Sequence, residues 1–108
     1  MLPNQERIKS EGDIKKLFRE RETKKEYPLF QIIQKTNQLT NSRLLVITGK
    51  KIGNAVERNR TKRIIKGLYL KNKHKIAKNC DFVVITKKAI KNEGEIIEEL
   101  RVAWAIND

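Results

Sequence analysis

The chain of 108 residues carries 25 lysines and arginines against 13 aspartates and glutamates, so its formal charge of +12 predicts an anionic partner. Its length allows one modest core, and we expect a single domain over residues 1–108. No apolar run approaches the roughly 20 residues of a membrane helix, and residues 1–10 lack the apolar stretch of a secretory signal. A single cysteine excludes an internal disulfide. These features favour a cytoplasmic protein with no membrane partner.

The first part of the chain predicts one helix followed by two strands. Asp13 is a suitable N-cap for a helix over residues 14–21, whose apolar side chains recur at positions i, i+3 and i+4. Residues 19–26 carry many charges of both signs and indicate a surface connection. Residues 27–35 are rich in β-forming types, and residues 43–48 are nearly all apolar. We therefore expect two strands here, the second one covered on both faces of its sheet.

A longer helix is predicted to begin directly after a turn at Gly53. Asn54 is a favoured N-cap residue because its side-chain oxygen can accept a free backbone N–H of the first turn. Glu57, three residues later, can reach back to the cap and complete a capping box. The helix is expected to continue to about Leu70.

The two sides of this helix differ in chemistry. On a helical wheel, Ile64, Ile65 and Leu68 form an apolar stripe. The opposite side, which we call the basic face, carries four cations and one amide: Arg58, Asn59, Lys62, Arg63 and Lys66. Arg60 lies at the border of the apolar stripe, where its guanidinium needs an acceptor or a path to solvent. An ordinary solvated face would mix both signs of charge, so cations without acids predict contact with a polyanion, most simply a nucleic acid.

The rest of the chain predicts a basic linker, one strand and one helix. The linker covers residues 71–79, the apolar strand covers residues 81–86, and the final helix covers residues 93–104. Two buried strands joined by a long helix require a crossover connection, which places them parallel to each other within a mixed sheet. Connections of this kind are usually right-handed.

No constellation of residues for catalysis occurs in the sequence. His74 and Cys80 lie in a lysine-rich stretch without further ligands, whereas a zinc site requires four. The glutamates of the final helix match the positive end of its dipole and are expected to face solvent. Neither a phosphate-binding loop nor a Ser/His/Asp arrangement is present. We expect no catalytic residue and no metal site in the polypeptide, so any chemistry must come from a partner.

The residues of the basic face also match a known family. The run Gly53-Asn54-Ala55-Val56-x-Arg58-Asn59-Arg60-x-Lys62-Arg63, preceded by Lys50-Lys51, resembles the signature of the protein subunit of bacterial ribonuclease P. The resemblance extends more weakly over nearly the whole chain, through Arg7-Ile8-Lys9, Asp13-Ile14-x-x-Leu17-Phe18 and Asp81-Phe82-Val83-Val84-Ile85.

The resemblance implies an α+β fold, a two-layer α/β sandwich with a mixed four-stranded sheet. The implied element order is α-β-β-β-α-β-α, with an unusual left-handed βαβ crossover in place of the usual right-handed one. It also implies a function in tRNA maturation. In this family a catalytic RNA subunit with bound Mg²⁺ removes the 5′ leader of precursor tRNA, and the protein assists without needing another protein partner.

The resemblance further implies two sets of contacts. The catalytic RNA subunit is expected to contact Lys50, Lys51, Asn54, Arg58, Asn59, Arg60, Lys62, Arg63 and Lys66. The single-stranded leader is expected to lie in a groove between the sheet and the first helix, where aromatic rings can stack on bases. The residues expected there are Ile14, Phe18, Tyr27 and Phe30. Packing in the core is an equally good interpretation of the Phe18 ring.

The chain departs from the family pattern at three places. Ile14 replaces a usual phenylalanine, Gly49 replaces a usual serine, and Lys66-Gly67 replaces a usual Arg-Glu pair. These departures affect leader binding more than docking on the RNA subunit. Gly67 costs about 1 kcal/mol relative to alanine inside a helix, and a close approach of either the sheet or the RNA would account for it.

Three other functions compete with this interpretation. The first is a small ribosomal or chaperone-like RNA-binding protein that uses the same basic face without a processing role. The second is a helix-turn-helix DNA-binding protein, although residues 43–48 predict a strand where that motif needs a helix. The third is an independent nuclease, which the missing catalytic ligands disfavour.

Overall fold

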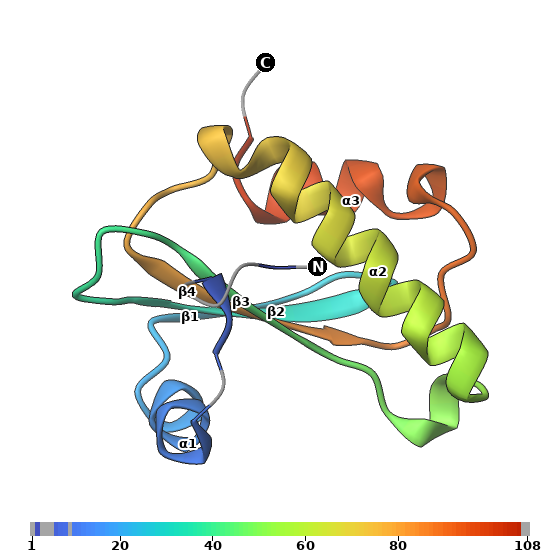
Figure 1. The fold of residues 1–108 in the computed structure, drawn as a ribbon, viewed down its shortest axis with the longest axis horizontal. Coiled ribbons are helices and arrows are strands. Elements are labelled where there is room, and N and C mark those ends of the chain that lie inside the picture. Colours follow the sequence, from blue (N-terminus) through green and yellow to red (C-terminus); the bar gives the residue numbers. More distant parts are fainter. Residues whose placement is uncertain (1, 3–5, 9, 107–108) are drawn as a thin grey trace.

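A computed structural model describes residues 2, 6–8 and 10–106 of the chain. In chain order the main elements are α1 (Glu11–Arg19), β1 (Thr23–Glu26), β2 (Phe30–Thr36), β3 (Arg43–Ile47), α2 (Ala55–Asn72), β4 (Cys80–Thr86) and α3 (Ile97–Ala103). Three short 3₁₀ turns flank the longer helices: η2 (Lys50–Ile52), η3 (Lys73–Lys75) and η4 (Glu93–Glu95). In Figure 1, α2 and α3 lie above the sheet and α1 lies below it. The α+β class and the α-β-β-β-α-β-α order are confirmed.

The four strands form one mixed sheet in the order β1-β2-β4-β3. β2 pairs antiparallel with both β1 and β4. β3 and β4 pair in parallel, and α2 lies between them in the chain, so the predicted crossover within a mixed sheet is confirmed. The left hand of that crossover stays a prediction.

The main core lies between the sheet and the α2–α3 pair. The strands contribute alternate residues to it: Phe30, Ile32, Leu44, Val46, Phe82 and Val84. The buried ring of Tyr69 on α2 meets Trp104 edge to face, with 5.8 Å between the ring centroids. The Tyr69 hydroxyl also forms a hydrogen bond with the hydroxyl of buried Ser42. Burial raises the pKa of Tyr69 and keeps the phenol protonated, so α2 is fixed over the edge strand β3 by packing and by a satisfied polar pair.

A second, smaller cluster lies on the other face of the sheet. Leu17 of α1 packs there with Ile8, Ile33 and Val83, all four of them buried. The predicted two-layer arrangement therefore describes the sheet with α2 and α3, and α1 adds a partial third layer. Because α1 is short, it covers only part of this face.

The predictions for the start of α1 and for residues 19–26 were wrong. The N-cap of α1 is Ser10 and not Asp13: the Ser10 hydroxyl accepts the Asp13 backbone N–H at 3.4 Å, so the helix starts earlier than expected. The charged connection over residues 19–26 contains the edge strand β1, whose residues are all exposed. An edge strand with lysines and no buried side chain has no hydrophobic alternation for sequence analysis to detect.

Candidate RNA interface

The start of α2 is fixed by a capping box. The Asn54 Oδ1 atom accepts the Glu57 backbone N–H at 2.9 Å, and the Glu57 Oε1 atom accepts the Asn54 backbone N–H at 3.1 Å. Arg58 donates from Nη1 to the Gly53 carbonyl oxygen at 3.2 Å. Gly53 has a φ of +156°, and a Cβ on it would lie 2.9 Å from the Glu57 Oε1 atom. Much of the Gly-Asn-Ala-Val-x-Arg pattern therefore serves to set the direction of α2.

We expect Gly53→Ala to lower the free energy of unfolding by about 2 kcal/mol, because it strains the backbone and displaces the capping carboxylate. Gly49→Ala is the matched control, since Gly49 has a φ of −73° and a Cβ on it would have no atom within 4 Å apart from the adjoining residues. Urea denaturation of both variants measures the effect. Equal stability of the two variants would show that the cap does not hold the start of α2.

The basic face lies on the solvent side of α2. Asn59, Arg60 and Arg63 are exposed, and Arg58, Lys62 and Lys66 are half-buried. Lys50 and Lys51 are exposed on η2, next to the start of the helix. A shallow groove of about 760 Å³ follows the helix, lined by Val56, Asn59, Lys62, Arg63, Lys66 and Gly67. Arg60 has the path to solvent that its position on the wheel requires.

None of the lysines and arginines predicted to contact the RNA subunit forms an ion pair with a carboxylate of the described residues. The ion pairs that the structure shows for residues 2, 6–8 and 10–106 involve other cations: Arg19, Arg43, Lys71, Lys73 and Lys87. Glu57, the one acid in this stretch, is engaged in the capping box. The ion pairs of the described residues thus leave the cations of the basic face and of η2 available, although like charges at this spacing repel one another.

The surroundings of Lys66 disfavour its charged form. Burial lowers the pKa of Lys66, and the nearby charges of Lys62 and Arg7 lower it further. Arg7 belongs to the N-terminal segment, and its backbone forms an isolated parallel β-bridge with Leu44 of β3. Its side chain donates from Nε to the Leu2 carbonyl oxygen at 2.7 Å. The spatial proximity of Arg7 to α2 was not visible in the sequence. A phosphate beside Lys66, Lys62 and Arg7 would attract all three cations and so offset their mutual repulsion.

The α1 side of the sheet forms a second candidate surface. Strand pairing arranges its residues in three rows across β2, β4 and β3, which are Lys35–Asp81–Arg43, Ile33–Val83–Leu45 and Gln31–Ile85–Ile47. Ile14 and Phe18 of α1 pack against the apolar part of these rows and remain half-exposed, as do Leu45, Ile47 and Ile85. The three aliphatic strand residues were missed, because an all-apolar strand predicts burial on both faces.

Two of the predicted leader residues do not belong to this surface. Phe30 is 0% exposed and lies in the main core on the opposite face of the sheet, so its ring cannot stack on a base. The half-buried Tyr27 ring stacks on Phe30, with 4.9 Å between centroids, and packs against the same core. The prediction was wrong for the Phe30 ring, because β2 has apolar residues on both faces and its sequence does not tell which face Phe30 takes. The leader contact of the partly exposed Tyr27 ring stays a prediction.

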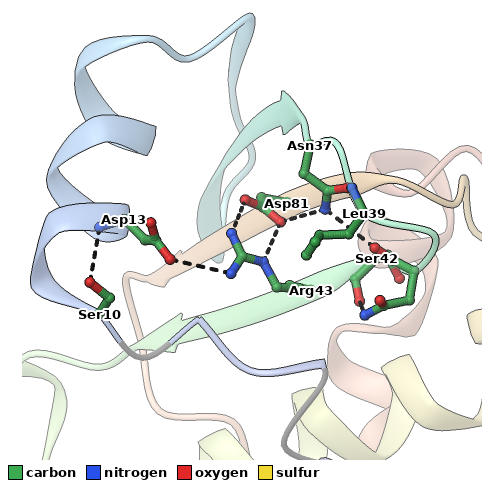
Figure 2. Close-up of polar contacts among 8 residues, drawn as sticks. Ser10, Asp13, Asn37, Leu39, Ser42, Arg43 and Asp81 are labelled. Atoms are coloured by element: carbon green, nitrogen blue, oxygen red, sulfur yellow. Dashed lines mark hydrogen bonds and ion pairs between the residues drawn. The ribbon is translucent and has the colours of Figure 1, made fainter.

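The row Lys35–Asp81–Arg43 lines a pocket of about 350 Å³ beside α1. Arg43 forms a bidentate salt bridge with Asp81: Nε donates to Oδ1 at 2.8 Å and Nη2 donates to Oδ2 at 2.7 Å. Figure 2 shows the Arg43 guanidinium between Asp81 and Asp13, while Asn37 donates to Asp81 Oδ1 at 2.7 Å. Hydrogen bonding to Asp81 raises the pKa of Arg43 against the opposing effect of burial. Lys16 also lines the pocket and has no ion pair among the described residues.

The remaining chemistry of the described residues is limited. No three His, Cys, Asp or Glu side chains in residues 2, 6–8 and 10–106 gather closely enough to hold a metal ion. Cys80 is buried, and His74 is exposed on η3. Among the described helices, none is long and apolar enough to cross a bilayer.

A basic helix face whose cations have no carboxylate partner among the described residues matches the electrostatic footprint of nucleic-acid-binding proteins. The family model described as Ribonuclease P matches residues 2–106. The ribonuclease P protein components of Thermotoga petrophila and Desulforapulum autotrophicum are 34% and 35% identical to the chain, covering 95% and 92% of it and 84% and 86% of their own lengths. The solved ribonuclease P protein of Thermotoga maritima superposes with a TM-score of 0.83 at 26% identity, over 95% of this chain and 99% of the other. The chain belongs to the ribonuclease P protein family.

Proposed function

We propose that this chain is the protein subunit of ribonuclease P, which binds a catalytic RNA subunit through α2 and assists removal of the 5′ leader from precursor tRNA. The observation that carries the proposal is the set of seven cations at residues 50, 51, 58, 60, 62, 63 and 66, none of them paired with a carboxylate of the described chain. Membership of the ribonuclease P family supports a catalytic RNA subunit as the polyanion that such a surface would meet.

Binding to the RNA subunit would be largely electrostatic. Each phosphate that pairs with a lysine or arginine releases condensed counterions, so affinity falls steeply with salt. Arg60 and Arg63 are exposed, so their guanidinium groups can form bidentate hydrogen bonds with phosphate oxygens. Arg58 already donates to Gly53, and its role is to hold the start of α2 as well as to contribute charge.

The α1-side surface would receive the single-stranded leader. Phe18 offers a half-exposed ring, and Leu45, Ile47 and Ile85 offer apolar contact next to it. Lys16 and Lys35 at the polar end provide charge for the leader backbone. Only one of these residues is aromatic, because Ile14 replaces a ring. We therefore expect leader binding that is tolerant of sequence and modest in strength.

The chemistry of cleavage would reside in the RNA partner in the cytoplasm. The described acids form no metal-binding group, whereas RNA phosphates offer the hard oxygen ligands that Mg²⁺ prefers. The cations of α2 would assist by offsetting phosphate repulsion, so that the RNA folds and holds Mg²⁺ at lower concentration.

Reconstitution with the RNA subunit tests the proposed function. We expect the purified protein to lower the Mg²⁺ concentration needed for 5′ cleavage of precursor tRNA. An unchanged Mg²⁺ requirement, together with binding to ribosomal RNA, would instead favour the ribosomal or chaperone-like alternative.

Leader binding predicts a specific effect of Phe18→Leu. This change keeps an apolar side chain against Leu17 and Val83 but removes the ring. We expect the holoenzyme to bind precursor tRNA about 5–150-fold more weakly, because stacking on one base contributes roughly 1–3 kcal/mol. Binding of mature tRNA, which lacks a leader, is the control and should not change. Equal losses for both RNAs would place Phe18 in the core only.

A further inference from the structure

Gly67 occupies a position in α2 where glycine is unfavourable. It lies inside an 18-residue helix, and glycine destabilises a helix interior relative to alanine. Its neighbours Ile65 and Leu68 point into the core and are almost fully buried. A structural reason for the glycine would require another element to approach the helix at this point.

No such approach exists in the described part of the folded chain. A Cβ built on Gly67 has no atom within 4 Å, apart from the backbone of the helix itself and the adjoining residues. The sheet and α3 contact α2 on its opposite side, through Ile65, Leu68 and Tyr69. The free protein would therefore accept alanine without strain, which leaves a bound partner as the reason for the open space.

The open space belongs to the groove along α2. Gly67 lines this groove of about 760 Å³ together with Val56, which is 63% exposed, and with Asn59, Lys62, Arg63 and Lys66. The groove thus combines bare helix backbone and one apolar side chain with three cations. No carboxylate and no aromatic ring of the described residues lines it.

This combination fits a ribose–phosphate backbone better than a base. Phosphates can pair with Lys62, Arg63 and Lys66, while the C–H faces of one ribose pack on Val56 and those of another, roughly 16 Å further along the helix, pack on the bare backbone at Gly67. A base would need an aromatic ring to stack on, and the described lining of the groove has none. Burial lowers the pKa of Lys66, and repulsion by Lys62 and Arg7 lowers it further; a phosphate beside Lys66 and Lys62 would offset the repulsive part.

We propose that Gly67 is the point of closest approach between α2 and the RNA, and that its missing side chain lets a ribose–phosphate segment of the RNA subunit lie directly on the helix. This inference deepens the proposed function and rests on it, and it revises the expectation that the Lys66-Gly67 departure affects leader binding more than docking on the RNA subunit. Gly67 is a positioning residue: it sets the distance at which Lys62, Arg63 and Lys66 meet the phosphates.

Substitution of Gly67 tests the inference because stability and binding should change in opposite directions. We expect Gly67→Ala to raise the melting temperature by roughly 3–6 °C, since alanine is the better helix former. Its Kd for the catalytic RNA subunit should rise several-fold. Gly67→Met should raise the Kd by about tenfold or more and flatten the dependence of log K on log salt, since phosphate contacts are lost.

The matched controls are Gly12→Ala and Gly12→Met in α1, where a Cβ meets only the Ser10 Oγ atom at 3.5 Å. These variants should leave the Kd and the salt dependence unchanged. A Gly67→Met protein that is folded and binds the RNA subunit as tightly as the wild type would overturn the inference. If the wild-type protein itself fails to bind the RNA subunit, the proposed function fails, which is a distinguishable result.

Discussion

A triple variant with Lys62→Ala, Arg63→Ala and Lys66→Ala is expected to bind the catalytic RNA subunit about 10²–10³-fold more weakly at 0.1 M salt or so. The slope of log K against log salt should fall by about 2–3, because each lost phosphate contact contributes roughly 0.9. The three side chains line the groove of α2 and have no carboxylate partner among the described residues. Filter binding over a salt series measures both quantities.

The control for this variant removes the same charge elsewhere. Lys24, Lys25 and Lys78 are exposed on β1 and on the loop before β4, away from α2. Their replacement by alanine lowers the net charge equally, and we expect little change in affinity. The triple α2 variant should remain folded, because alanine favours the helix and the substitutions remove repulsion. Equal losses of affinity in both variants would mean that overall charge, and not the α2 surface, determines binding.

The largest effect on stability is expected from Asp81→Asn. The Asp81 side chain is 7% exposed and the Arg43 side chain 18% exposed, and the substitution leaves the guanidinium without its main partner. Breaking a buried pair from one side costs about 3–5 kcal/mol, and we expect about 3 kcal/mol because Arg43 retains Asp13 at 3.4 Å. Urea denaturation should show a lower midpoint at an unchanged slope.

The surface pair Lys71–Glu93 provides the comparison for this experiment. Its Nζ–Oε1 distance is 2.9 Å, but the side chains are 63% and 45% exposed. Glu93→Gln should therefore cost only about 0–1 kcal/mol, because water screens the pair. Similar losses for Asp81→Asn and Glu93→Gln would show that the Arg43 pair is not a structural anchor between β3 and β4.

The elements that the sequence predicted well are those with a strong local signal. The capping box at Asn54 and Glu57 marked the start of α2 correctly, and the apolar runs marked β3 and β4. These features depend on neighbours in the chain, so they are readable from the order of residues alone. The family signature is of the same kind, since its residues run without a break from η2 through the N-cap Asn54 into the first turns of α2.

The features that were missed depend on contacts between distant segments. The strand β1 is recognisable only from its pairing with β2, because its four residues are all exposed. The side of the sheet taken by Phe30 depends on register, and each face of β2 carries an isoleucine, Ile32 on one and Ile33 on the other. Leu45 and Ile47 remain half-exposed because α1 ends before it covers them. Whether a helix is long enough to cover a sheet depends on how the two pack, which the order of residues does not show.

Site-directed crosslinking distinguishes docking of the RNA subunit on α2 from docking on another surface of the protein. The chain has one cysteine, Cys80, which is only 7% exposed, so a cysteine introduced at the surface can be labelled selectively with a photoreactive group. Val56 in the α2 groove and Val102 on α3 are matched positions, 63% and 67% exposed. We predict that the Val56→Cys protein crosslinks to the catalytic RNA subunit and that the Val102→Cys protein does not. Equal crosslinking from both positions, or crosslinking from Val102→Cys alone, would contradict docking through α2.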